Sequence, residues 1–212
     1  MAGKAAVQSA AVSGAIGVFG GTFDPPHIGH LIVALHARHH LAMERVLLVV
    51  ANRPWQKEDR RPVTAAEHRL AMVELSIAGV DGLEASDLEI RRGGHSFTID
   101  TVKELERSAG REIVLVLGQD AAAGLESWER TEELRRRVTL AVVKRPGATG
   151  AAPSGWRSVV VEAPWLEVSS TDLRARFGDG RPLEFLTPPA VIGYARRHRL
   201  YDPAPAAKAT GG

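Results

Sequence analysis

Short apolar runs alternate along this chain with stretches in which apolar residues recur every three or four positions. The runs lie at residues 16–19, 46–50, 83–90, 113–117, 138–143 and 159–161. Continuous apolar runs of this length are typical of strands that a sheet buries on both faces. The pattern therefore predicts strands at these six places.

Helical spacing separates several of these strands. It is clearest in an amphipathic stretch that begins near Ile28 and continues through Leu41. Further helices are expected at residues 67–77, 98–107 and 188–199, the last with a proline in its first turn. Strands that alternate with helices predict an α/β fold, a single domain in which helices cover both faces of an open parallel sheet.

Two helix starts carry polar capping patterns. Thr64 and Glu67 have the spacing of a capping box before the helix at residues 67–77. Ser169 and Asp172 repeat that spacing near the C-terminal end of the chain. We therefore expect Thr64 and Ser169 to be the N-cap residues of their helices.

Composition narrows the classes of protein. The chain has 212 residues, 44% of them hydrophobic, which is enough for one compact domain at residues 15–202 between flexible segments 1–14 and 203–212. A net charge of +2 does not indicate the basic surface that binds nucleic acid. The absence of cysteine excludes disulfides, thiolate metal sites and a thiol nucleophile. No apolar segment has the length of a membrane span, so we expect a cytoplasmic protein without a membrane partner.

The residues GGTFDPPHIGH, at positions 20–30, lie where the first strand should turn into a helix. Gly20 and Gly21 allow the backbone to approach a bulky anion, and the following helix offers unpaired N–H groups and the positive end of its dipole. His27 and His30 are three residues apart and can reach the same phosphate group. The pattern predicts a phosphate site with two imidazoles, which suggests catalysis.

The histidines also have an ordinary interpretation. His27 could merely cap the helix, and His30 could be a surface histidine. The neighbouring glycines favour the phosphate site. His36, His39 and His40 lie on the same helix without such a loop and are expected to be solvated, and no carboxylate or thiolate is spaced to complete a metal site with them.

The loop resembles the HxGH signature of the nucleotidyltransferase superfamily, and its flanks resemble the bacterial nicotinate-nucleotide adenylyltransferases. Similar blocks follow in order as NRPWQK, EHRLAMVELSI, HSFTIDT, LGQDA, SWE, KRPG and PWLEVSSTDLR, within residues 15–202. The resemblance implies a Rossmann-like fold and transfer of AMP from ATP to nicotinate mononucleotide, giving deamido-NAD and pyrophosphate. It also implies direct in-line attack without a covalent intermediate, with Mg²⁺ on the ATP.

Site residues follow from the resemblance position by position. It implies that His27, His30 and Arg174 are catalytic. The implied ATP-binding residues are Gly20, Gly21, Thr22, Phe23, His27, His30, Lys57, Gly118, Asp120, Ser169, Ser170, Thr171 and Arg174. The implied nicotinate mononucleotide-binding residues are Thr22, Thr98, Trp128, Glu129, Arg145 and Trp165. No metal-ligating residue is implied.

Most of these residues also have a purely structural interpretation. Lys57 and Arg145 could be solvated charges, Asp120 and Thr98 helix caps, and Trp128 a core side chain. The resemblance instead implies that Trp128 stacks on the pyridine ring and that Asp120 binds the adenosine ribose.

Glu129 needs separate treatment, because an inward carboxylate would repel nicotinate. We expect its side chain to point to solvent and its backbone N–H to face the ring.

Other functions are compatible with the same nucleotide-binding cleft. The acceptor could be nicotinamide mononucleotide, phosphopantetheine or another small phosphate, and a nucleotide-binding regulator without turnover could keep the same cleft. A fragment of an aminoacyl-tRNA synthetase is disfavoured because the chain has no KMSKS-like block. The oligomeric state does not follow from the sequence.

Overall fold

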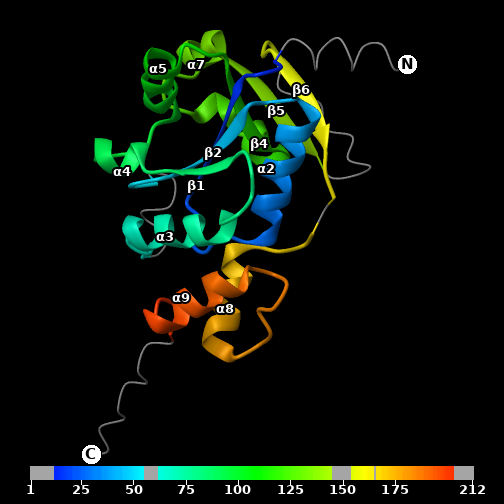
Figure 1. The fold of residues 1–212 in the computed structure, drawn as a ribbon. Coiled ribbons are helices and arrows are strands. Elements are labelled where there is room, and N and C mark those ends of the chain that lie inside the picture. The colour runs from blue at the N-terminus through cyan, green and yellow to red at the C-terminus, as the bar shows by residue number, and fades with distance from the viewer. Residues whose placement is uncertain (1–11, 55–61, 145–153, 165, 203–212) are drawn as a thin grey trace, which may run out of the picture.

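The protein is represented by a computed structural model that describes residues 12–54, 62–144, 154–164 and 166–202. Within these ranges six parallel strands form one sheet in the order β3-β2-β1-β4-β5-β6 (Figure 1). The strands are β1 (Ile16–Gly21), β2 (Arg45–Val50), β3 (Leu83–Ser86), β4 (Ile113–Gly118), β5 (Val138–Lys144) and β6 (Ser158–Glu162). The predicted Rossmann-like parallel sheet is therefore confirmed.

The strand order reverses its direction between β1 and β4, which are neighbours through register pairs such as Val18 with Leu115. In open parallel sheets, ligands bind beyond the carboxyl ends of the strands at such a switch point. The loops that follow Gly21 and Gly118 leave the sheet there, so the topology alone places the 20–30 loop at the expected site.

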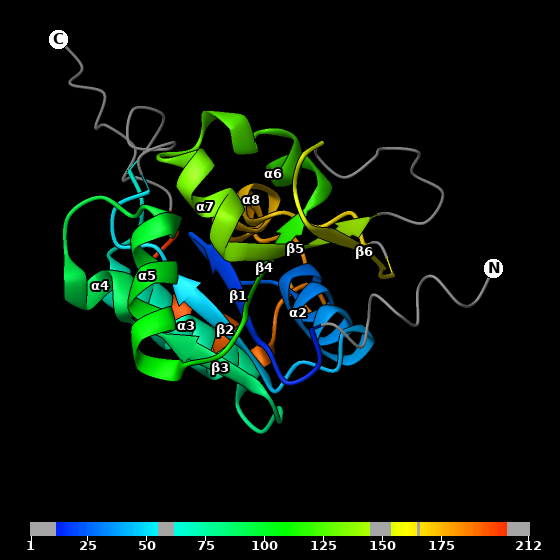
Figure 2. The same ribbon diagram turned by 90° about the horizontal axis from the view of Figure 1, so that it is seen from above.

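Helices cover both faces of the sheet. The described helices are α2 (Ile28–His40), α3 (Ala66–Ile77), α4 (Leu88–Arg92), α5 (Thr98–Ala109), α6 (Gln119–Ala123), α7 (Thr131–Arg137), α8 (Ser170–Asp179) and α9 (Pro189–Arg197), with a 3₁₀ turn η1 (Leu125–Ser127). Figure 2 shows α2 on one side of the sheet and α5 and α7 on the other.

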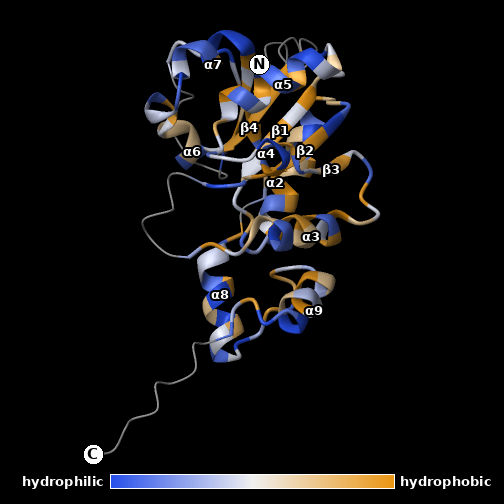
Figure 3. Cartoon of the chain, turned by 90° about the vertical axis from the view of Figure 1, so that its left-hand side faces the viewer, coloured by the Kyte–Doolittle hydropathy of each residue, from blue (hydrophilic) through white to orange (hydrophobic). Residues whose placement is uncertain are grey.

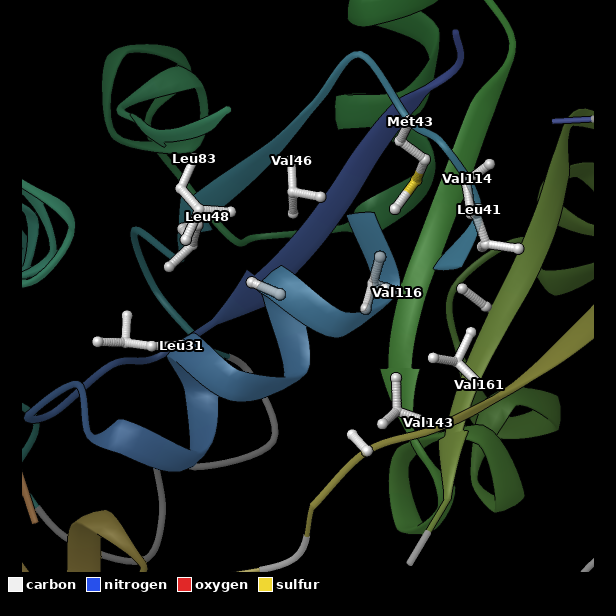
Figure 4. Close-up of a cluster of buried hydrophobic side chains, with 14 of the residues drawn as sticks. Leu31, Leu41, Met43, Val46, Leu48, Leu83, Val114, Val116, Val143 and Val161 are labelled. Carbon is white, nitrogen blue, oxygen red and sulfur yellow. The ribbon is translucent and has the colours of Figure 1, made fainter. Parts of the chain in front are cut away.

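Alternate strand residues feed two separate cores. Val46, Leu48, Val114 and Val116 pack with α2 and α3 in one cluster, which Figure 4 shows in close-up. Their sequence neighbours, such as Leu47 and Leu115, pack with α5 and α7 in the other cluster. This alternation explains why the strands read as continuous apolar runs, and Figure 3 shows hydrophobic colour gathered on them.

The C-terminal helices α8 and α9 lie outside the sheet, beyond the carboxyl ends of the strands (Figure 1). Val191 and Ala195 of α9 pack against Met72 of α3 in a small cluster of their own. Because these helices lie at the ligand-binding edge, side chains from residues 166–202 can reach the 20–30 loop.

Several sequence predictions need correction. The strand expected at residues 83–90 ends at Ser86, and the short helix α4 takes up its second half. Helix α3 begins after the N-cap Ala65, so Thr64 does not cap it. Val12, assigned by sequence to the flexible start, is buried in the core. Residues 1–11 and 203–212 lie outside the described ranges.

Candidate active site

The 20–30 loop connects β1 to α2, as the sequence predicts, and places both histidines at the start of α2. His27 is the N-cap residue in an extended conformation, and His30 is the third helical residue. Their rings stack with centroids 3.7 Å apart and 25° between the planes. The backbone N–H of His27 donates to Nδ1 of His30 at 3.1 Å. Because this Nδ1 is an acceptor, the neutral His30 ring carries its proton on Nε2 and can donate from there.

Neighbouring rings lie close to two glycines of the loop. A Cβ at Gly21 would lie 2.7 Å from the Phe23 ring, and one at Gly29 would lie 3.1 Å from Nδ1 of His27. A Cβ at Gly20 would meet nothing within 4 Å. Gly20 therefore leaves its side of the loop open, as close approach of a phosphate requires.

His27 is a neutral imidazole in the free protein. Burial lowers its pKa from 6.5 to about 4, because removal from water disfavours the charged ring. Its Nδ1 is buried against the first turn of α2, beside Gly29 and the backbone of His30, so this atom does not face a ligand. The neutral ring can bind a phosphate through its other nitrogen, Nε2–H, without a resident positive charge.

The ring resonances of His27 should titrate near pH 4 in the free protein, well below the ordinary value of 6.5. The unfolded chain then binds more protons than the folded one between pH 4 and 6.5, so stability is full above 6.5 and falls as the pH approaches 4. The His27 contribution lost over this window is roughly 3 kcal/mol. NMR titration measures the pKa, and His27→Gln should show a weaker pH dependence of unfolding. Titration of His27 near pH 6.5 would contradict this assignment.

Side chains from the C-terminal segment, residues 166–202, form hydrogen bonds with the 20–30 loop. The Tyr201 hydroxyl donates to Oδ1 of the buried Asp24 at 2.8 Å. Ser170 donates to the carbonyl of Pro25 at 2.8 Å, and Thr187 donates to that of Pro26 at 2.8 Å. Burial, followed by the charge of Asp24, raises the pKa of Tyr201, so this donor keeps its proton. These contacts indicate that Asp24 holds the loop in place.

Arg174 lies against the same loop. Its Nη1 donates to the Asp24 carbonyl at 2.7 Å, and its Nη2 donates to Oγ1 of Thr171 at 3.0 Å. Ser169 caps α8 as predicted, since its side chain accepts from the backbone N–H of Asp172 at 3.1 Å. The start of α8, with its dipole, is thus joined directly to the histidine loop.

Arg69 is a central residue of the site that the sequence interpretation did not identify. The residue is 1% exposed, and its guanidinium donates to three backbone carbonyls. The acceptors are Thr64 at 2.7 Å, Thr22 at 2.9 Å and Asn52 at 3.0 Å. Arg69 therefore connects the histidine loop with the segments that follow β2 and precede α3. An arginine inside an amphipathic helix was the only sequence signal for this role.

A pocket of about 280 Å³ opens beside the switch point. It is lined by Phe19, Gly20, Gly21, Thr22, Ala51, Pro54, Glu89, Ser96, Phe97, Thr98, Leu115, Leu117, Gly118, Ala121, Trp128 and Glu129. Among these described residues the charged side chains are both acidic, Glu89 and Glu129. The N-terminus of α5 supplies positive potential, because Thr98 is the first residue of that helix.

Comparison with known proteins places the chain in a family. A family model described as cytidylyltransferase-like matches residues 18–176. A curated protein of Roseiflexus sp. (strain RS-1), named "Probable nicotinate-nucleotide adenylyltransferase", is 39% identical over 89% of this chain and 98% of its own. A protein of the same name from Methylibium petroleiphilum is 39% identical over 89% and 92%. The chain belongs to the nicotinate-nucleotide adenylyltransferase family.

Solved structures show the same fold at lower identity. Nicotinic acid mononucleotide adenylyltransferase of Plasmodium falciparum, complexed with NaAD, has a TM-score of 0.72 at 20% identity and covers 88% of this chain and 96% of its own. The same enzyme complexed with APC has a TM-score of 0.71 at 19% identity and covers 88% and 96%. At these identities the likeness supports the fold, and the site rests on this chain's own residues.

The structure brings together two groups of the residues expected in the family site. Seven of them line the pocket: Gly20, Gly21, Thr22, Thr98, Gly118, Trp128 and Glu129. His27, His30, Ser170, Thr171 and Arg174 surround the adjoining phosphate loop through the contacts above. Asp120 is exposed in the first turn of α6, after the N-cap Gly118, so it does not cap that helix. Lys57, Arg145 and Trp165 lie outside the described residues.

Three individual expectations can now be refined. Thr98 is not an N-cap, since Phe97 holds that position. Trp128 is both a pocket wall and a packing residue, because it is partly buried against the α5 and α7 core. The Glu129 side chain is 52% exposed, as expected for a carboxylate that points to solvent.

Two findings concern metals and membranes. No group of three or more metal-ligating His, Asp or Glu side chains occurs in the described ranges. No helix within those ranges is long and apolar enough to cross a membrane.

Proposed function

We propose that this chain transfers AMP from ATP to nicotinate mononucleotide, giving deamido-NAD and pyrophosphate in NAD biosynthesis. The observation that carries the proposal is the stacked His27 and His30 pair on an open glycine loop at the switch point, next to a pocket of suitable size. Membership of the family supports ATP and nicotinate mononucleotide as the substrates. The named relatives are nicotinate-nucleotide adenylyltransferases, and the Plasmodium enzyme is complexed with NaAD.

The chemistry needs no covalent enzyme intermediate. An oxygen of the acceptor's phosphate attacks the α-phosphorus of ATP, and the bond to the β-phosphate oxygen breaks, so that pyrophosphate leaves with the electron pair. The protein's tasks are to align the two phosphates and to stabilise the charge that moves to the leaving group. We assign these tasks to His30 Nε2–H, the His27 ring and the backbone of Gly20 and Gly21.

The phosphates extend from the histidine loop toward the start of α8. Thr171 and Arg174 lie there, and we assign them to the triphosphate together with Lys57. Mg²⁺ enters as part of the substrate Mg-ATP and reduces the negative charge of the phosphates. An ion held by the nucleotide's own oxygens requires few protein ligands.

We assign the acceptor to the pocket beside β4. Trp128 offers a flat face to a pyridine ring, and the N-terminal N–H groups of α5 near Thr98 are donors for a carboxylate. Arg145 and Trp165 remain assigned to the acceptor by family resemblance. The acidic pair Glu89 and Glu129 is the observation that favours an uncharged nicotinamide acceptor as the second candidate.

Product identification tests the proposal. The protein is incubated with Mg-ATP and, separately, with nicotinate mononucleotide, nicotinamide mononucleotide and phosphopantetheine. We expect deamido-NAD and pyrophosphate, identified by mass, as the main products. An adenylylated product from phosphopantetheine alone would replace the acceptor, and nucleotide binding without any product would favour a regulator.

A further inference from the structure

We propose that Arg130 is a specificity-determining positioning residue, which neutralises Glu129 of the pocket lining and the nearby Asp100 of α5 and thereby favours an acceptor with an anionic ring. This inference rests on the proposed function. It concerns the choice between the acid and the amide, which differ by one negative charge next to the pyridine ring.

The contacts of Arg130 bridge the two sides of the pocket. Its Nη2 lies 2.8 Å from Oδ2 of Asp100, and its Nε lies 3.9 Å from Oε1 of Glu129. Asp100 is in the first turn of α5, two residues after Thr98, and Glu129 follows Trp128. One guanidinium thus serves both the helix that offers N–H donors and the loop that offers the ring-stacking face.

The two acidic side chains that line the pocket lie near different arginines. Glu89 lies 3.8 Å from Arg92, whereas Glu129 and the nearby Asp100 are paired with Arg130. Asp100 stabilises the first turn of α5, but its charge also offsets the positive potential that this helix end presents to an anion. Pairing Asp100 and Glu129 with Arg130 leaves that potential available to a carboxylate.

The backbone of Arg130 supports a role for its side chain. Arg130 is the N-cap of α7 in the left-handed region, with φ 49° and ψ 44°. Glycine adopts this conformation without the steric cost that an arginine bears. Backbone geometry therefore does not explain the arginine, and Arg130→Gly removes the guanidinium while keeping the local conformation accessible.

A purely structural role is separable, because other ion pairs also join α5 to α7. Lys103 lies 3.0 Å from Glu133, and Arg137 lies 2.6 Å from Glu106 and 3.1 Å from Glu133. These residues are farther along both helices and do not line the pocket. Arg137→Gln is thus a matched control that weakens the same helix pair without exposing a carboxylate at the pocket.

The experiment measures kcat/KM of the full chain for the acid and amide mononucleotides at low ionic strength. For two unit charges about 7 Å apart at an effective dielectric constant of about 40, Coulomb repulsion corresponds to roughly five- to tenfold in affinity. In Arg130→Gly we expect kcat/KM for the acid to fall by this factor through KM, and that for the amide to stay within about twofold. Arg130→Lys should retain most of the preference.

A double variant combines Arg130→Gly with Glu129→Gln. It should recover at least half of the preference for the acid that Arg130→Gly loses. Arg137→Gln should leave the ratio of acid to amide unchanged. Equal losses for both acceptors, or the same shift in Arg137→Gln, would overturn the role of Arg130 while leaving the adenylyltransferase intact. If the unaltered protein forms no deamido-NAD, the proposed function fails and this inference fails with it.

Discussion

His30→Ala is expected to lower kcat by roughly 10² to 10³, the usual effect of losing one preorganised donor to transition-state charge. The Nδ1 of His30 accepts a hydrogen bond from the His27 backbone N–H at 3.1 Å. This bond fixes the orientation of the ring and therefore of its Nε2–H donor. The affinity for ATP should change much less, because the loop backbone and α8 remain. Steady-state kinetics with Mg-ATP and a separate nucleotide-binding measurement distinguish the two effects.

Two further variants sharpen this test. His30→Gln keeps a side-chain N–H donor and should retain more turnover than His30→Ala. His36 is exposed on the same helix, so His36→Ala is the matched control and should behave like the unaltered protein. Near-normal turnover in His30→Ala would remove this histidine from the chemistry, however well the loop fits a phosphate.

Arg69→Leu is expected to lower the free energy of unfolding by roughly 3–5 kcal/mol, because it leaves the carbonyls of Thr22, Asn52 and Thr64 without their shared donor. Each unsatisfied buried acceptor costs about 1–3 kcal/mol. The same change frees the histidine loop from its neighbours, so we also expect a fall in kcat at temperatures where the variant is folded. Urea unfolding measures the first effect.

Arg69→Lys separates charge from geometry. A lysine ammonium cannot present the planar fork that reaches three carbonyls, so its stability should lie between that of Arg69→Leu and the unaltered protein. Arg91→Leu removes an exposed arginine paired with Asp87 and should cost under about 1 kcal/mol. If Arg69→Leu were no less stable than Arg91→Leu, the three hydrogen bonds would not hold the loops together.

The sheet could be predicted from sequence because burial on both faces leaves a plain signal. Val46 to Val50 reads as apolar at every position, since alternate side chains enter two different cores. Short elements leave weaker signals. Helix α4 has five residues and α7 has seven, lengths at which apolar spacing does not distinguish a helix from a strand or a loop.

The histidine loop was likewise visible, since glycines and histidines stand together in eleven residues. The contacts that hold this loop in place could not be predicted from the sequence. Tyr201 bonds Asp24 across 177 positions, and Arg174 reaches the Asp24 carbonyl across 150. Such contacts depend on where α8 and α9 pack, and no local pattern encodes that. The pairing of Arg130 with Asp100 also appears only once α5 and α7 lie side by side.

The measurement that tests the central claim most directly is kcat/KM for nicotinate mononucleotide against nicotinamide mononucleotide, with Mg-ATP and identification of both products by mass. A pocket that offers N–H donors to a carboxylate leaves the amide's NH₂ facing a donor, which costs a buried unpaired group. We predict that the acid is strongly preferred and gives deamido-NAD. Equal values, or a preference for the amide, would contradict the nicotinate assignment.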